Sequence, residues 1–134
     1  TPNISVWHGV PHSLADYFAS LHKIRALPVQ MSFPAHRTGQ GELNARIDQL
    51  IAHHKDRLDE ICQAVRENPD TTAYEIAGLI RWSARGLPWA EFPPHQKWFA
   101  MGETLAHLVY LTDKGQIARL SKNGQIIYQI TTRH

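Results

Sequence analysis

The sequence has little of what marks secreted or membrane-bound proteins. Its 134 residues include a single cysteine, Cys62, which cannot form a disulfide within the chain. No apolar run is long enough for a membrane helix, and the first residues lack the basic and apolar segments of a signal peptide. We therefore expect a cytoplasmic protein that has no membrane partner.

The chain also has little net charge, because positive and negative residues are nearly equal in number. Fourteen Lys and Arg residues almost cancel twelve Asp and Glu residues, which leaves a formal net charge of +2. So small an excess points to no particular charged partner. With 43% hydrophobic residues, however, the chain can bury one compact core and carry an appended piece.

The first 42 residues contain one predicted helix and one predicted strand. Apolar residues recur at three- and four-residue steps over residues 13–27, where Ser13 and Asp16 resemble a capping box at the start of the helix. Residues 29–33 then alternate apolar and polar side chains and stop at Pro34, as a half-buried strand does. One helix and one lone strand cannot form a core, so we interpret this part as the end of another domain.

Three further helices are predicted after residue 42. The first runs from residue 43 to the sequence "ENPD" at residues 67–70, and its apolar face holds over roughly six turns. Thr72 and Glu75 open the second in a capping-box pattern, and the third covers about residues 95–112. The apolar face predicted for the first helix comprises Leu43, Ile47, Leu50, Ile51, His54, Leu58, Ile61, Cys62 and Val65, and that of the third Trp98, Met101, Leu105, Leu108 and Val109.

The chain ends in a predicted β-hairpin. Gly115 suits the left-handed residue after the last helix, and Asn123-Gly124 lies between two β-branched runs at residues 116–120 and 125–130. Three helices followed by a hairpin is the order of a winged helix-turn-helix. We therefore expect a mainly α fold with a small antiparallel β wing over residues 43–134.

Six segments carry a resemblance to a known family. In chain order they read "TPNISVW", "LADYFASLHKIRAL", "VQMSFPAH", "RIDQLIAHHKDRLDEI", "TAYEIA" and "GETLAHLVYLTDKGQIAR". Together they resemble the C-terminal part of a metallo-β-lactamase-fold hydrolase, in the glyoxalase-II-like branch that ends in a winged-helix domain. The resemblance implies that residues 1–42 are the end of an αββα metallo-β-lactamase-like domain, and that residues 43–134 are a winged-helix-like C-terminal domain.

The resemblance also implies a metal ligand. His36 in "PAHR" matches the histidine of the family's Pro-Gly-His-Gly corner, although Ala35 and Arg37 replace the glycines. The family's His-x-His-x-Asp-His box is missing, because no two of the nine histidines have His-x-His spacing. His36 would thus bind one metal of a two-zinc site only with ligands from outside this chain. We expect the chain alone to hold no zinc stably and to be inactive.

Four other residues are candidates for a cleft or an interface: His53, His54, Arg57 and His107. Adjacent histidines on a helix point about 100° apart, so they do not easily chelate one metal. We interpret His54 as a core or interface histidine and His53 as its polar neighbour. His107 is interpreted as a packed histidine that could pair with Glu103, four residues before it. We assign no catalytic residue to this chain.

Two functions follow from these patterns. The first is the C-terminal fragment of a zinc-dependent hydrolase that cleaves a small-molecule ester, thioester, lactam or phosphodiester. Its partner would be a missing N-terminal metallo-β-lactamase domain, and its winged helix would shape the active-site cleft or form the interface of a homodimer. The alternative is a winged-helix nucleic-acid-binding module, which needs a basic helix and wing. We expect no nucleic-acid partner, because that region offers only Lys97, Lys114, Arg119 and Lys122 against two acidic residues.

Overall fold

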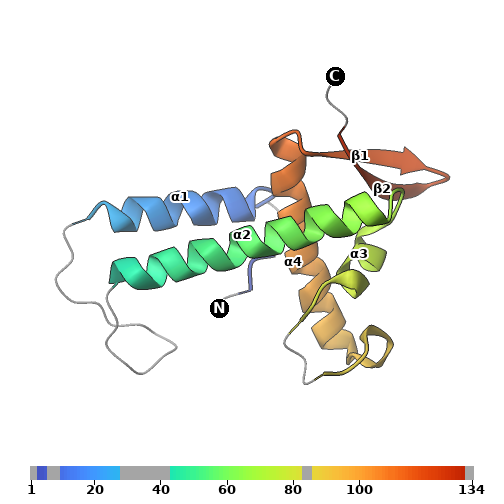
Figure 1. The fold of residues 1–134 in the computed structure, drawn as a ribbon, viewed down its shortest axis with the longest axis horizontal. Helices are drawn as coiled ribbons and strands as arrows, with labels where there is room; N and C mark the ends of the chain where they lie inside the picture. The colour runs from blue at the N-terminus through green and yellow to red at the C-terminus, as the bar shows by residue number, and fades with distance from the viewer. Residues whose placement is uncertain (1–2, 6–9, 28–42, 83–85, 132–134) are drawn as a thin grey trace.

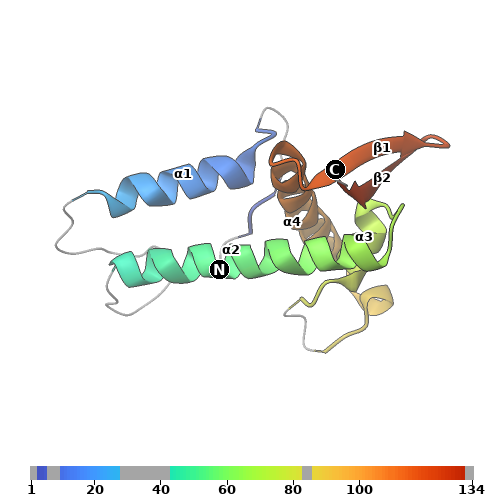
Figure 2. The ribbon, with the colours of Figure 1, turned by 45° about the horizontal axis from the view of Figure 1, so that its top comes forward.

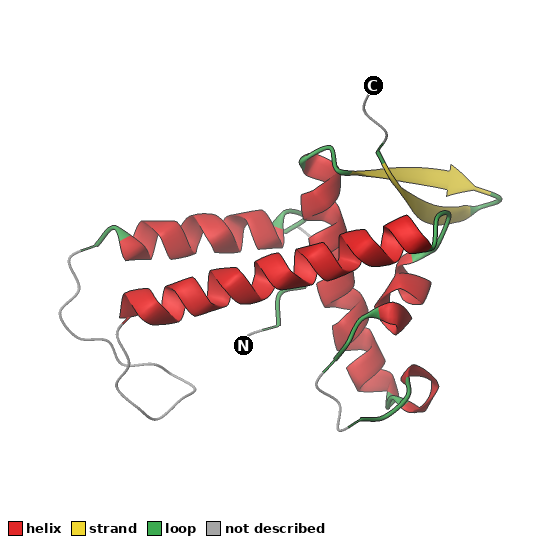
Figure 3. Cartoon of the chain, in the orientation of Figure 1, coloured by secondary structure: helices red, strands yellow, loops and turns green. Residues whose placement is uncertain are grey.

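The computed structural model describes residues 3–5, 10–27, 43–82 and 86–131 of the chain. In these residues it forms four α-helices, one short 3-10 helix and a two-stranded antiparallel sheet (Figures 1 and 3). The predicted fold class, mainly α with a small antiparallel β element, is confirmed. The elements are α1 (Ser13–Arg25), α2 (Leu43–Glu67), α3 (Ala73–Leu79), η1 (Trp89–Glu91), α4 (Pro94–Asp113), β1 (Ile117–Lys122) and β2 (Gln125–Ile130).

Helix α2 runs along the longest dimension of the structure (Figure 1). Helix α1 runs antiparallel beside it, and α4 crosses it at a steep angle (Figures 1 and 2). Helix α3 packs against both α2 and α4, and the hairpin lies next to the C-terminal ends of α2 and α4. The crossing of α2 and α4 therefore lies at the centre of the fold.

The main core fills the space between α2, α3, α4 and the hairpin. Helix α2 presents its buried stripe there, because residues spaced three and four apart share one face of a helix. Burial confirms most of the predicted face, with Ile61 and Val65 both fully inaccessible. The larger buried members of this core are Leu14, Leu58, Ile61, Val65, Ile76, Ile80, Leu108, Leu111, Ile117 and Tyr128.

Helix α1 belongs to the same packing. Its Leu14 is 1% exposed and lies in the main core, while Leu21 packs with Ile47 and Leu50 in a second, smaller cluster. The predicted strand at residues 29–33 and the proposed domain boundary at residue 42 lie outside the described residues. The division into residues 1–42 and 43–134 therefore stays a prediction.

The start of α1 differs from the prediction. Ser13 is the first helical residue and His12 occupies the N-cap position, without a capping side-chain hydrogen bond. The Ser13 hydroxyl is buried and has no hydrogen-bond partner among the described residues. The predicted capping box was wrong, because the helix begins one residue too early for the Ser13 side chain to cap it.

The predicted cap of α3 is confirmed. The Thr72 side chain accepts a hydrogen bond from the backbone N–H of Glu75 at 3.3 Å. This bond satisfies one of the free N–H groups in the first turn of the helix.

The turn at the end of α4 and the hairpin are also as predicted. Gly115 has φ 73°, and the N–H groups of Gly115 and Gln116 bond back to the carbonyls of Thr112 and Leu111, as in a Schellman motif. Asn123 and Gly124 have φ 52° and 77°, the pattern of a type I′ turn. The turn sets the register that pairs Lys122 with Gln125.

The buried face of α4 was predicted wrongly. Trp98 is 55% exposed, and of the five predicted apolar residues only Leu108 is fully buried. Besides Leu108 and Leu111, the buried face of α4 carries small and polar residues, which the apolar pattern did not reveal. These residues are Ala100, Glu103, Thr104, Ala106 and His107.

None of the described helices is both long and apolar enough to span a bilayer.

We predict that Leu14→Ala lowers the free energy of unfolding by about 2–5 kcal/mol, because it leaves a cavity in the main core. Leu27→Ala is the matched control: this leucine follows the same helix and is 56% exposed, so its loss should cost less than about 0.5 kcal/mol. Urea unfolding of the purified chain measures both. Equal costs for the two variants would show that α1 does not share the core.

Candidate functional site

Four ionisable side chains meet where α2 crosses α4. His53 and His54 come from α2, and Glu103 and His107 come from α4; we call them the His–Glu cluster. His54 lies four residues after Leu50 on the buried stripe of α2, and Glu103 and His107 are one turn apart on the buried face of α4. The side chains of His54 and His107 are 0% exposed, whereas His53 is half-buried.

A chain of hydrogen bonds links the two helices through the histidine rings. His107 Nδ1 lies 2.7 Å from the backbone oxygen of Glu103, and its Nε2 lies 3.2 Å from His54 Nδ1. A carbonyl oxygen only accepts, so His107 Nδ1 carries the proton and His107 Nε2 accepts from His54 Nδ1–H. The pairing predicted between Glu103 and His107 therefore forms through the Glu103 backbone.

Burial keeps these rings neutral. It lowers the pKa of His54 to about 4 and that of His107 to about 3, because the low-dielectric interior disfavours an imidazolium. A neutral ring carries one proton, so His54, protonated at Nδ1, has a bare lone pair at Nε2. This buried nitrogen has no hydrogen-bond partner among the described residues.

Glu103 and His53 complete the electrostatics of the cluster. Burial raises the pKa of the Glu103 carboxyl, and the nearby Arg57 offsets part of that rise. Burial also lowers the pKa of His53, and the Arg57 charge lowers it further. The cluster thus combines neutral nitrogen donors with a carboxyl group that lies in a poorly solvated position.

One donor atom each from His53, His54 and Glu103 lies within 4.8 Å of the other two. The sequence argued against a shared metal for two adjacent histidines, and it gave no third ligand. The third ligand comes from another helix, so spacing along the chain could not reveal it. A usable signal was the short polar group Glu103, Thr104 and His107 in the middle of α4, among apolar neighbours such as Met101, Leu105 and Leu108.

Arg57 borders the cluster as a structural anchor. Its guanidinium lies 4.3 Å from the centre of the Trp82 ring, and Nη1 donates to the backbone oxygen of Arg81 at 2.9 Å. Glu60 Oε1 lies 3.5 Å from the same nitrogen. These contacts tie the segment that follows α3 to α2, so the positive charge is held in place beside the cluster.

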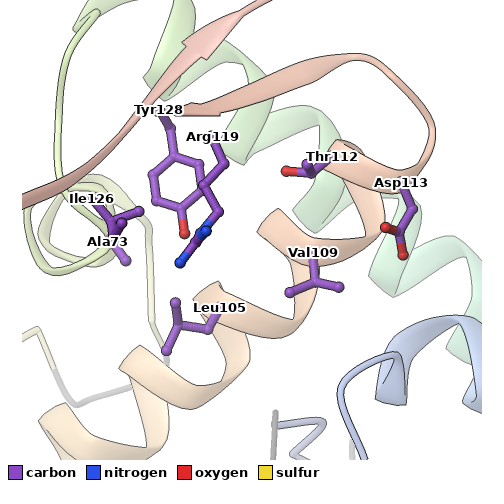
Figure 4. Close-up of a pocket in the computed structure, with 8 residues that line it drawn as sticks. All are labelled: Ala73, Leu105, Val109, Thr112, Asp113, Arg119, Ile126 and Tyr128. Atoms are coloured by element: carbon purple, nitrogen blue, oxygen red, sulfur yellow. The ribbon is translucent and has the colours of Figure 1, made fainter. Parts of the chain in front are cut away.

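Two of the cavities that border α4 lie beside the cluster and beside the hairpin. One, of about 300 Å³, adjoins the cluster at Glu103 and is lined by Asn3, Trp82, Phe92, Gln96, Phe99 and Ala100 as well. The other is a groove of about 450 Å³ between α4 and the hairpin. Figure 4 shows Leu105 and Val109 rising from α4 toward Ile126, Arg119 and Tyr128. The groove uses the apolar residues of α4 that the sequence placed in the core.

Each of the four cations considered for nucleic-acid binding contacts an aromatic ring, a carboxylate or a hydroxyl group. The ammonium groups of Lys97 and Lys114 lie 5.7 Å and 5.4 Å from the ring centres of Trp89 and Tyr110. Lys122 lies 3.5 Å from the Asp70 carboxylate. Burial raises the pKa of Tyr128, and a hydrogen bond from Arg119 offsets part of that rise. On the described surface of α4 and the hairpin, these four side chains do not form a continuous row of cations without such contacts.

His36 lies outside the described residues, so its predicted role as a metal ligand stays a prediction.

We predict that acid destabilises the metal-free chain in part through His54 and His107. Their folded pKa values lie below the usual 6.5, so the unfolded chain binds more protons as the pH falls from about 6.5 toward about 4 and about 3. Each histidine then contributes a slope of up to about 1.4 kcal/mol per pH unit. Glu103 acts in the opposite sense, because its raised pKa favours the folded chain at lower pH.

Urea unfolding with EDTA, between about pH 7.5 and about pH 5, measures this slope. The variant His107→Gln should show a shallower dependence than the parent chain. Identical slopes would mean that the buried histidine does not contribute.

The chain is similar to known proteins in both sequence and structure. The sequence profile described as "Metallo-beta-lactamase-like, C-terminal domain" matches residues 58–131, more than half of the chain. The match begins in the second half of α2 and ends just after the hairpin. A comparison with curated protein sequences gives no match.

Two solved structures are similar over nearly the whole chain. A beta-lactamase domain protein from Burkholderia ambifaria is 33% identical, with a TM-score of 0.80, over 96% of this chain and 37% of its own. A metallo-beta-lactamase family protein from Thermus thermophilus is 26% identical, with a TM-score of 0.74, over 97% of this chain and 38% of its own. The chain thus spans little more than a third of either protein. The predicted resemblance is confirmed at this level: the chain belongs to the metallo-beta-lactamase-like C-terminal domain family.

Proposed function

We propose that this chain is the C-terminal module of a zinc-dependent hydrolase of the metallo-β-lactamase superfamily, and that it is inactive alone. The observation that carries the proposal is the family match over residues 58–131, together with solved relatives of which the chain spans only 37% and 38%. The rest of such a protein would supply the metal site and bind the small-molecule substrate.

The packing of α1 supports a rigid connection between the two parts. We propose that residues 1–42 are the end of the catalytic domain and that residues 43–134 form the winged-helix-like module. Leu14 would then belong to the catalytic domain and yet pack into the core beneath α2 and α4. Such burial would hold the module in one orientation beside the active-site cleft.

The groove between α4 and the hairpin supports a role in covering that cleft. Leu105, Val109 and Ile126 present apolar surface there, and Arg119 and the Tyr128 hydroxyl add a few polar groups. An apolar surface with a small number of placed polar groups is typical of a surface that lines a ligand site or meets another domain. We propose that this face closes one side of the cleft or meets a second copy in a homodimer.

The described residues do not provide the family's two-zinc site. Their His–Glu cluster combines an adjacent histidine pair with a glutamate from another helix, which is not the His-x-His-x-Asp-His pattern. We therefore assign no catalytic step to this chain. Its proposed contribution is to position and enclose substrate.

The test is a comparison of the chain with the protein encoded by its full reading frame. We expect that frame to add a His-x-His-x-Asp-His box upstream of Thr1, and the longer protein to hydrolyse a p-nitrophenyl ester, a thioester, a chromogenic lactam or bis-p-nitrophenyl phosphate. EDTA should abolish turnover, and the 134-residue chain should give none. A stop codon directly upstream, or equal turnover by the chain alone, would contradict the proposal.

A gel shift tests the alternative, in which the winged helix binds nucleic acid. Affinity for nucleic acid depends on cations that neutralise phosphates, and the four cations of α4 and the hairpin region are already engaged. We expect no retardation of mixed DNA or RNA at low salt. Retardation that weakens as salt rises would favour the winged helix as a nucleic-acid-binding module.

A further inference from the structure

We propose that His53, His54 and Glu103 form a zinc site on this module, separate from the two-zinc site of the superfamily, and that His107 positions His54 for it. From the sequence alone, no zinc was expected to bind this chain stably. The side chains that the fold brings together argue for the contrary.

The donor set suits zinc. Two imidazole nitrogens and one carboxylate are a known three-ligand set for zinc, which leaves a fourth position for water. The three donors lie within 4.8 Å of one another, whereas ligands of one tetrahedral zinc lie about 3.4 Å apart. Small rotations of the half-buried His53 and of Glu103 would close that difference. The site is thus nearly assembled by the helix crossing.

The hydrogen-bond chain prepares His54 as a ligand. His107 Nε2 accepts a hydrogen bond from His54 Nδ1–H, so the lone pair is left at His54 Nε2, which is buried and has no partner among the described residues. A buried nitrogen without a partner destabilises the fold unless another group satisfies it. Zinc would satisfy it, and a fixed tautomer is how an outer hydrogen bond orients a metal-binding histidine.

The charges around the cluster are compatible with a cation. Arg57 and, near His53, Arg46 disfavour one, but the Arg57 guanidinium is held against Trp82 and bonded to the Arg81 carbonyl. The poorly solvated Glu103 carboxylate supplies the opposite charge as a direct ligand. Glu103 also lines the cavity of about 300 Å³, which gives an ion a route from solvent. A bound zinc ion would cross-link α2 to α4.

The experiment uses the 134-residue chain without an affinity tag, because a histidine tag itself binds zinc. After treatment with EDTA and desalting, the chain is titrated with Zn²⁺ by calorimetry and with Co²⁺ by absorption spectroscopy. We expect one equivalent of each ion and the intense visible bands of tetrahedral Co²⁺. His53→Ala and Glu103→Gln should each weaken binding by at least about tenfold. Circular dichroism checks that the variants stay folded.

Two matched controls separate this site from others. His95→Ala removes an exposed histidine of α4 and should leave the zinc affinity within about twofold of the parent value. His36→Ala should have equally little effect. Loss of binding in His36→Ala, with binding retained in His53→Ala, would place the zinc at the family's corner and overturn the proposal.

Two further variants test how the cluster works. His107→Gln should weaken zinc binding by about 10–100-fold and keep the shape of the Co²⁺ spectrum, because the ligands remain while their positioning is lost. Arg57→Gln should bind zinc at least as tightly as the parent chain. Weaker zinc binding by a folded Arg57→Gln, checked by circular dichroism, would contradict a cation site beside this charge.

Absence of stoichiometric zinc binding in the folded parent chain would also refute the proposal. So would equal affinities for the parent chain, His53→Ala and Glu103→Gln. The readout is metal binding by this chain, so its outcome does not depend on whether the longer protein is a hydrolase.

Discussion

The structure depends on a hydrogen bond between two buried histidines, His54 of α2 and His107 of α4. It lies where the two central helices cross, with the aromatic edges of Tyr17 and Phe18 of α1 against the His54 ring. Polar groups at such a crossing tolerate little change, because each lost partner leaves a buried donor or acceptor unsatisfied. The pair therefore links α2 to α4 at their crossing, and it also selects which nitrogen of His54 stays bare.

Part of the His–Glu cluster lies within the region that matches the family. The matched region, residues 58–131, contains the second half of α2, α3, α4 and the hairpin, and so it contains Glu103 and His107. His53 and His54 lie just before it, on the same continuous helix. The position that we propose beside an active-site cleft would require a fixed shape, and ties between α2 and α4 at their crossing would provide it.

The sequence predicted what local chemistry decides. Thr72 caps α3 and Asn123-Gly124 closes the hairpin, because a cap or a tight turn needs only neighbours in the chain. The sequence-based prediction was wrong for the buried face of α4, which depends on packing against helices that are distant in the chain. Trp98 of α4 is 55% exposed and Glu103 of the same helix is 7% exposed, because the packing of α2 and α3 decides which face of α4 is buried. Glu103 could not be recognised as a neighbour of His53 without the crossing angle. His36 rests on family resemblance alone.

In the metal-free chain, His54 and His107 are neutral and both protonated at Nδ1, which leaves His54 Nε2 bare. The most direct measurement is the correlation of ring nitrogens with ring protons by NMR on ¹⁵N-labelled, metal-free chain at about pH 7. We expect the Nδ1–H tautomer for both rings, and a change at His54 Nε2 when zinc is added. A protonated His54 Nε2, or an imidazolium at either position, would contradict it.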